Sequence, residues 1–290
     1  MMQNKAVRSV IDFFKALAQE FTRDNVPVLA AAQAYYYMLS LFPMLILILS
    51  IIPYFNLDPN LIISLLYDFV PGDIAEMIED QIVDLVTEQR TGLLTFGVLG
   101  TIWSASNGMN TFIKAQNEAY NVTVLRPFWK ARLISIGLTL GLIVALVIAL
   151  LLPVLGDTII GFISSFGVLT EELEELFMML RWVVSISLLG LIFAVLYTLA
   201  PNKKIPFRYT LPGAVFATMS WQLTSFGFSV YISNFANFSQ TYGSLGGIIV
   251  LMLWLFLIGI ILVVGAEINA ILYRRRHADR RLDPEDDYMI

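Results

Sequence analysis

Residues 243–272 read GSLGGIIVLMLWLFLIGIILVVGAEINAIL, an apolar run in which Glu267 is the only charged residue. A helix needs ~20 predominantly apolar residues to cross ~30 Å of hydrocarbon, and this run is long enough. Five other apolar stretches precede it along the chain. Their lengths predict an all-α membrane protein with six transmembrane helices, and with short amphipathic helices in the outer loops and at the N-terminus. The predicted spans are 29–54, 92–113, 133–155, 180–200, 209–231 and 243–272.

The charged residues between these spans are sorted by sign. Basic residues occupy every second gap, and of the 18 Lys and Arg residues only Arg90 and Arg181 fall elsewhere. Because basic loops stay on the cytoplasmic side, we expect a multi-pass protein of the cell (inner) membrane with both termini in the cytoplasm. The residues assigned to that side are Lys5, Arg8, Lys15, Arg23, Lys114, Arg126, Lys130, Arg132, Lys203, Lys204, Arg208, Arg274, Arg275, Arg276, Arg280 and Arg281.

Three regions are predicted along the chain. They are a cytoplasmic amphipathic segment at 1–27, a six-helix transmembrane domain at 28–273 and a charged cytoplasmic tail at 274–290. In the first region, apolar residues recur every three or four positions between 5 and 23, which predicts an amphipathic helix. This helix lies either on the inner membrane surface or packed under the bundle, and the sequence favours neither arrangement.

Acidic residues collect in two of the outer gaps. The segment 55–91 carries eight Asp and Glu residues among apolar residues at helical spacing, and 170–179 carries four Glu residues. Both segments predict short helices that form an outer cap. The alternative is a solvated loop face that binds no ligand.

The composition excludes several classes of function. With 58% hydrophobic and 14% charged residues and a mean hydropathy of +0.74, the chain is unlike a soluble domain. Without cysteine, it has no disulfide, thiolate nucleophile or Cys-ligated metal. The net charge of −5 hides basic rims that suit anionic lipids at the cytoplasmic face, so nucleic acid is not needed as a partner. The sequence indicates no metal and no organic cofactor.

Two stripes of polar residues run along predicted membrane helices. In a lipid-facing helix every polar side chain costs free energy, so a stripe faces protein or water. These stripes either hold the bundle together by hydrogen bonds between helices or line a path for a solute. The first stripe, in the second span, contains Ser104, Asn107, Thr111, Lys114 and Glu118, and the second, in the fifth span, contains Thr218, Gln222, Ser225 and Ser229.

Glu267 is the most costly polar residue of the last span. It lies ~10 Å before Arg274 at 1.5 Å per residue, so we expect it to be protonated, wetted by a cavity or paired. Lys114 is the first candidate partner and Arg132 the second. The residue is either a member of a structural ion pair or a site for a coupling ion.

Four stretches of the chain resemble one family. They are AAAQAYYYMLSLFP at 30–43, WSA at 103–105 followed by Asn117 and Tyr120, YGSLG at 242–246, and GAEIN at 265–269, which ends on Asn269. Together they resemble the YihY/BrkB family of bacterial inner-membrane proteins. That resemblance implies six spans with cytoplasmic ends. Members formerly carried the label ribonuclease BN, one branch is linked to serum resistance, and a transport role is commonly assumed.

Two functions remain open from the sequence. The first is a transporter or flippase-like permease, in which the polar stripes, Glu267 and Asn269 form a path for a small or lipid-like solute. The second is a membrane scaffold, or an envelope-stress or virulence factor, that binds protein partners through its acidic outer cap. A nuclease needs clustered carboxylates or histidines, and His277 stands alone among arginines, so we expect no enzyme. Nothing in the sequence supports a homo-oligomer.

Overall fold

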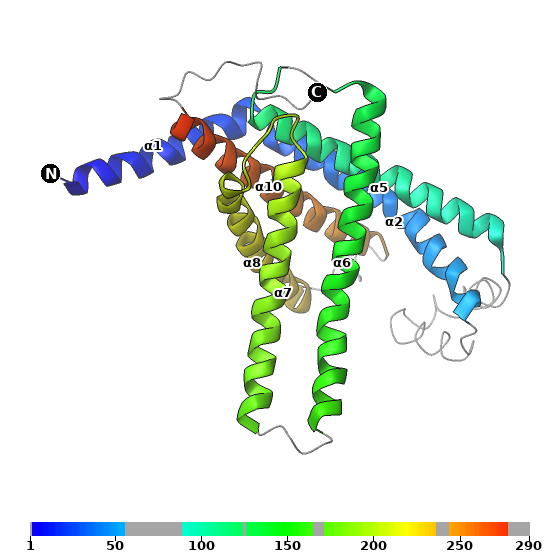
Figure 1. Ribbon diagram of the computed structural model, residues 1–290. Coiled ribbons are helices and arrows are strands. Elements are labelled where there is room, and N and C mark those ends of the chain that lie inside the picture. The colour runs from blue at the N-terminus through cyan, green and yellow to red at the C-terminus, as the bar shows by residue number, and fades with distance from the viewer. Residues whose placement is uncertain (1, 56–88, 124–125, 165–170, 236–243, 278–290) are drawn as a thin grey trace. The chain divides into compact units, whose positions relative to one another are not determined.

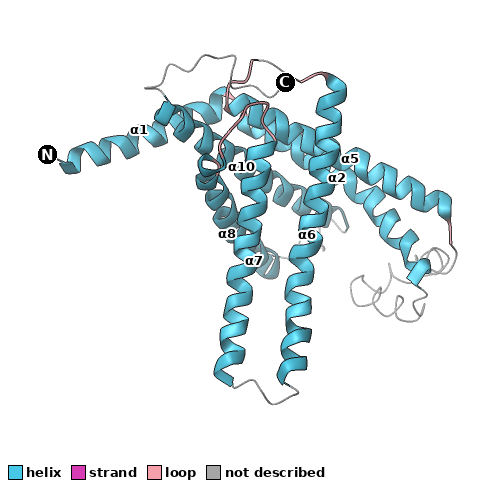
Figure 2. Cartoon of the chain, in the orientation of Figure 1, coloured by secondary structure: helices cyan, strands magenta, loops and turns pink. Residues whose placement is uncertain are grey.

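The structure is a computed structural model that describes residues 2–55, 89–123, 126–164, 171–235 and 244–277. Within these ranges all regular structure is helical (Figure 2). The α-helices are α1 (Met2–Arg23), α2 (Val26–Ile51), α5 (Thr91–Ala119), α6 (Phe128–Ser164), α7 (Glu171–Leu199), α8 (Leu211–Phe235) and α10 (Ser244–His277), with short 3-10 turns at Ile52–Phe55 and Phe207–Tyr209.

Most of each predicted apolar stretch lies in one of these helices, which confirms an all-helical fold for the described residues. Among the described residues, three helices contain segments that are long and apolar enough to cross a membrane: Val26–Ile51, Phe128–Ala145 and Gly246–Arg276. The apolar segment Val183–Leu199 of α7 is shorter than that length. The number of six membrane spans therefore stays a prediction.

The predicted outer helices have two different outcomes. The acidic segment at 170–179 does not form a separate short helix, because α7 runs without a break from Glu171 to Leu199. An apolar sequence follows the glutamates directly, so nothing in the chain ends the helix between them. Residues 56–88, which include nearly all of the other acidic segment, lie outside the described residues.

The chain divides into two compact units. One unit contains residues 1–34 and 108–290, and the other contains residues 35–107. In the smaller unit, α2 and α5 pack closely because two glycines of α5 face α2. A Cβ on Gly97 would lie 2.8 Å from the Cα of Leu47, and one on Gly100 would lie 2.9 Å from the Cβ of Pro43. Small residues allow this close approach of two apolar helices.

In the larger unit, α7, α8 and α10 meet around two glycines. A Cβ on Gly213 of α8 would overlap the carbonyl oxygen of Gly265 on α10, and a Cβ on Gly265 would overlap the hydroxyl of Tyr197 on α7. The Tyr197 hydroxyl donates to the Leu262 carbonyl at 2.9 Å, and the Gly213 N–H donates to Oδ1 of Asn269 at 2.7 Å. The three helices are thus joined by close packing and by buried hydrogen bonds.

The other helices of the larger unit are arranged around this core. Figure 1 shows α6 and α7 as two long neighbouring helices and α1 leading away from the end of α10. The apolar side chains Val10, Ile11 and Phe14 of α1 are exposed, whereas the last turn of α1 contacts α10 through Glu20 and Arg274. The predicted amphipathic N-terminal helix is therefore present.

Basic residues from four separate parts of the chain meet at one end of the larger unit, which we call the basic end. Arg23 donates to Oδ1 of Asn121 at 3.1 Å, and Arg274 donates to the carbonyl of Ala119, the last residue of α5, at 2.8 Å. Cations near the last carbonyls of a helix stabilise its C-terminus. Two further contacts belong to this end: Arg126 donates to the carbonyls of Ala200 and Pro201, and Lys203 lies 5.2 Å from the centre of the Tyr273 ring.

Candidate functional site

The junction between α1 and α2 places two acidic side chains at the basic end. Asp24 follows α1 directly, its N–H still donating to the Glu20 carbonyl at 2.9 Å. Asn25 then adopts a φ of 50°, a left-handed conformation that asparagine tolerates better than most residues. Because Glu20 and Asp24 are four residues apart, their side chains lie on the same face of the helix.

The third acidic residue at this position is Glu267 of α10. The carboxylates of Glu20, Asp24 and Glu267 each offer an oxygen, and these oxygens lie within 4.8 Å of one another. The local packing explains the approach. Val26, Ala115 and Val263 form a small buried cluster one turn away from Glu267, and Gly259 lets α10 approach the backbone of α2 at Ala30. We call the three residues the acidic triad.

Two arginines neutralise part of the triad. Arg23 forms ion pairs with Glu20 and, at 2.8 Å, with Asp24, and Arg274 pairs with Glu20 at 2.8 Å. The hydrogen bond to Asp24 is the main reason that the pKa of Arg23 is raised. Glu267 is different, because it is fully buried and neither carboxylate oxygen has a hydrogen-bond partner within the described chain.

The prediction that Glu267 pairs with Lys114 is therefore wrong, and a pair with Arg132 stays a prediction. Lys114 and Glu267 lie at similar depths along α5 and α10, but their side chains face different ways. Lys114 is exposed in the wall of a pocket, whereas Glu267 faces α1. Depth says how far two residues lie from a helix end, but not which faces of their helices meet.

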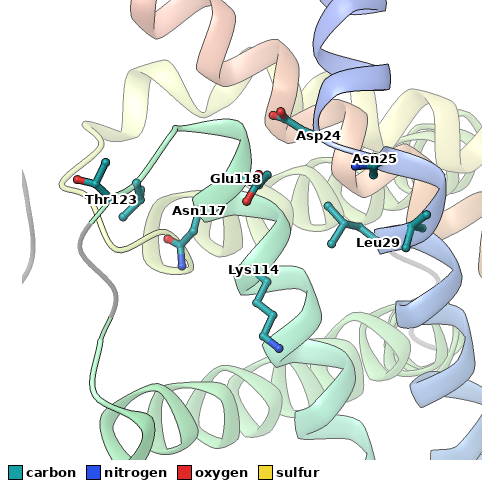
Figure 3. Close-up of a pocket in the computed structure, with 9 residues that line it drawn as sticks. Asp24, Asn25, Leu29, Lys114, Asn117, Glu118 and Thr123 are labelled. Carbon is teal, nitrogen blue, oxygen red and sulfur yellow. The ribbon is translucent and has the colours of Figure 1, made fainter.

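A polar pocket adjoins the triad at Asp24. Its volume is about 480 Å³, and Figure 3 shows Asp24 and Asn25 on one side and Lys114, Asn117 and Glu118 of α5 on the other. The charged lining residues are one cation, Lys114, and two anions, Asp24 and Glu118, and apolar side chains form the rest of the wall. The remaining lining residues are Val28, Leu29, Val122 and Thr123.

Only the last turns of the α5 stripe reach this pocket. Lys114 and Glu118 line it, whereas Thr111 is buried and does not. Ser104, also buried, and Asn107 belong to the smaller unit. The stripe therefore supplies pocket residues at one end and buried or half-buried polar groups along the rest of its length.

The second stripe lies elsewhere. Thr218 of α8 donates to the Ala214 carbonyl at 2.8 Å and borders a separate apolar groove of about 420 Å³ between α7 and α8. Gln222 and Ser225 are half-buried and line neither this groove nor the pocket beside Asp24. Asn269 joins α10 to α8 through Gly213 and does not line the pocket.

The sequence did not indicate the two triad members of α1. Neither Glu20 nor Asp24 was predicted as a site residue, because each resembles an ordinary charged residue of an amphipathic helix. The signal that was available is their spacing of four residues directly before an Asn at a helix junction. Gln33 and Gln116 were also missed, and both are fully buried with no partner for the side-chain amide within the described chain.

The donor atoms of the triad define its chemistry. Only oxygen is offered, and carboxylate oxygen is the ligand of hard cations and of protons. The pocket offers groups of both charges together with apolar surface, which suits a solute that carries both signs of charge. The side chain of Glu20 is 14% exposed and that of Asp24 is 3% exposed, so little of the triad is open to solvent.

Comparison with known proteins gives one family match and several relatives. The family model described as "Virulence factor BrkB" matches residues 17–289. A Bacillus subtilis protein with the provisional name ribonuclease-like protein YfkH is 40% identical over 96% of this chain and 100% of its own length. No solved structure matches.

More distant relatives are named as membrane proteins. The UPF0761 membrane protein of Vibrio parahaemolyticus is 29% identical over 95% of this chain and 86% of its own length. That of Alteromonas mediterranea is 26% identical over 97% of both chains. The likeness therefore extends over nearly the whole sequence and includes both parts of the site.

Proposed function

Because the chain belongs to the BrkB virulence-factor family of membrane proteins, we propose that it is a permease for a small or amphiphilic solute. The observation that supports this proposal is the pocket of about 480 Å³ at the basic end. A membrane scaffold that only binds protein partners has no need for charged side chains around a pocket of this size. The proposal places the basic end and both termini in the cytoplasm, with six membrane spans.

The lining of the pocket indicates the class of solute. Lys114 attracts an anionic group, Glu118 and Asp24 attract a cationic group, and Val28 and Leu29 contact an apolar part. A zwitterionic amphiphile satisfies all three, whereas a simple anion or an uncharged sugar leaves a charged side chain without a counterpart. No step of covalent chemistry is needed, and we propose no enzymatic role.

Flux through reconstituted protein tests the proposal. Proteoliposomes would be assayed for movement of acyl-labelled phosphatidylethanolamine between leaflets and for uptake of radiolabelled zwitterionic amino acids. We expect flux of at least one probe above that of empty liposomes. Lys114→Ala should reduce it about tenfold, which corresponds to ~1.4 kcal/mol.

A matched variant controls for lost charge. Lys130→Ala removes a cation of the neighbouring basic segment that does not line the pocket, so flux should stay unchanged. No flux across either class of probe, or equal loss in the two variants, would contradict the proposal. The scaffold alternative depends on the acidic segment at 55–91, most of which lies outside the described residues, and it stays a prediction.

A further inference from the structure

The geometry of the acidic triad is that of a site for one ion. Its three ligand oxygens lie within 4.8 Å of one another, so some point between them lies no more than about 2.8 Å from each. Oxygen-ligated Ca²⁺ has ligands at about 2.3–2.6 Å, so a slight contraction brings the three oxygens to bonding distance of an ion of this size. The ligands come from α1, from the residue that follows it, and from α10.

A second observation points to a ligand at this position. Glu267 is fully buried, its oxygens face Glu20 and Asp24, and both oxygens lack a hydrogen-bond partner within the described chain. A carboxylate buried against two other carboxylates is destabilising unless a proton or a cation lies between them. Glu20 and Asp24 are held by arginines, so the cost remains with Glu267.

Two further buried polar side chains of α5 and its end lack a hydrogen-bond partner within the described residues. Tyr120 is 5% exposed, and its hydroxyl lacks a partner within the described residues. Burial, followed by the charges of Tyr273 and Glu267, raises the pKa of Tyr120 above its usual value, so it remains a neutral hydroxyl near Glu267. Gln116 lies one helical turn before it and is fully buried with an unpartnered amide.

We propose that Glu20, Asp24 and Glu267 bind a small monovalent cation, Na⁺ in preference to K⁺. The charge balance selects the valence. When all three carboxylates are ionised, they and the two paired guanidinium groups of Arg23 and Arg274 leave one negative charge. A monovalent cation makes this enclosed site neutral, whereas a divalent cation leaves a buried positive charge. Oxygen-only ligands and the short distances to the centre favour the smaller alkali ion.

The site would link ion binding to the pocket of the proposed permease. Asp24 belongs to both, so an ion held by its carboxylate changes the charge that a solute meets in the pocket. The cation site does not rest on transport, because it follows from the burial and charge of the triad alone. Its occupation should stabilise the junction between α1 and α10.

Thermal unfolding of the purified full-length protein in detergent tests the site. The melting temperature would be followed while NaCl replaces choline chloride at constant ionic strength, with KCl and CaCl₂ as separate series. We expect a saturable rise of several degrees with Na⁺ and a smaller one with K⁺. Binding of ²²Na⁺ at equilibrium should saturate at one ion per chain.

Two variants should abolish the Na⁺ response. Glu267→Gln removes the unpaired charge, so the protein in choline should melt no lower than the parent while NaCl no longer raises its melting temperature. Asp24→Asn serves if that variant fails to fold. Asp12→Asn is the matched control, since it removes an exposed acid of α1 outside the triad and should keep the full response.

Three results would overturn the assignment. One is a response to Ca²⁺ at concentrations where Na⁺ has none, which makes the site divalent. Another is a melting temperature that rises at low pH in the parent but not in Glu267→Gln, and that no metal ion changes. That result would mean that the triad binds a proton. The third is equal Na⁺ dependence in Glu267→Gln and Asp12→Asn. Na⁺ binding without solute flux would remove only the permease, and flux without Na⁺ binding would remove only the cation site.

Discussion

At the scale of single residues, one glycine determines how closely two helices approach. Gly213 packs against the carbonyl of Gly265 and the side chain of Asn269. We expect Gly213→Ala to lower the free energy of unfolding by about 3 kcal/mol, because overpacking at a backbone contact forces the helices apart. Reversible unfolding in mixed detergent measures the change.

Gly137→Ala is the matched control for that substitution. Gly137 lies inside α6, and a Cβ there has nothing within 4 Å. Alanine has the higher helix propensity, so this variant should be neutral or more stable by up to about 1 kcal/mol. A similar loss of stability in both variants would mean that the contact between Gly213 and Gly265 does not matter.

At the scale of elements, α1 carries an exposed apolar face. Val10, Ile11 and Phe14 are exposed although they are apolar, and in a membrane protein such a face is covered by lipid if the helix lies at the bilayer surface. The chain has no cysteine, so a single one directs a fluorescent label to one position. A polarity-sensitive label on Phe14→Cys should report an apolar environment in liposomes.

Asp12→Cys provides the comparison on the same helix. Asp12 is two residues away and lies on the opposite side of the helix from Phe14, so its label should report water. Identical emission at both positions would contradict a helix lying at the bilayer surface. It would favour the alternative that the sequence left open, a helix packed under the bundle.

At the scale of the whole molecule, the sorting of basic residues predicts the orientation. We expect both termini and Lys204 in the cytoplasm and Arg90 outside. In intact cells a membrane-impermeant thiol reagent should label Arg90→Cys and not Lys204→Cys, and both should react after lysis. The reverse pattern would invert the proposed topology and move the pocket to the outer side.

The helices could be predicted from the sequence because length and apolar composition are local properties. Most of each of the six apolar stretches falls in a helix of the described residues, and the high cost of Glu267 in an apolar helix correctly marked it as unusual. Its neighbours could not be predicted, since Glu20 and Asp24 lie more than two hundred residues earlier and no local spacing relates them to α10. The incorrect partner, Lys114, came from matching depth without knowing which helix faces meet.

The meeting of Tyr197, Gly213 and Gly265 has a mechanical consequence. Helices that touch backbone to backbone cannot slide without opening a gap, and the hydrogen bonds from Tyr197 and to Asn269 resist twisting. The segments of α7, α8 and α10 around this contact would therefore keep their relative positions during a conformational change. Displacement would fall to other parts of the larger unit, such as the last turn of α1, which contacts α10 through the side chains of Glu20 and Arg274.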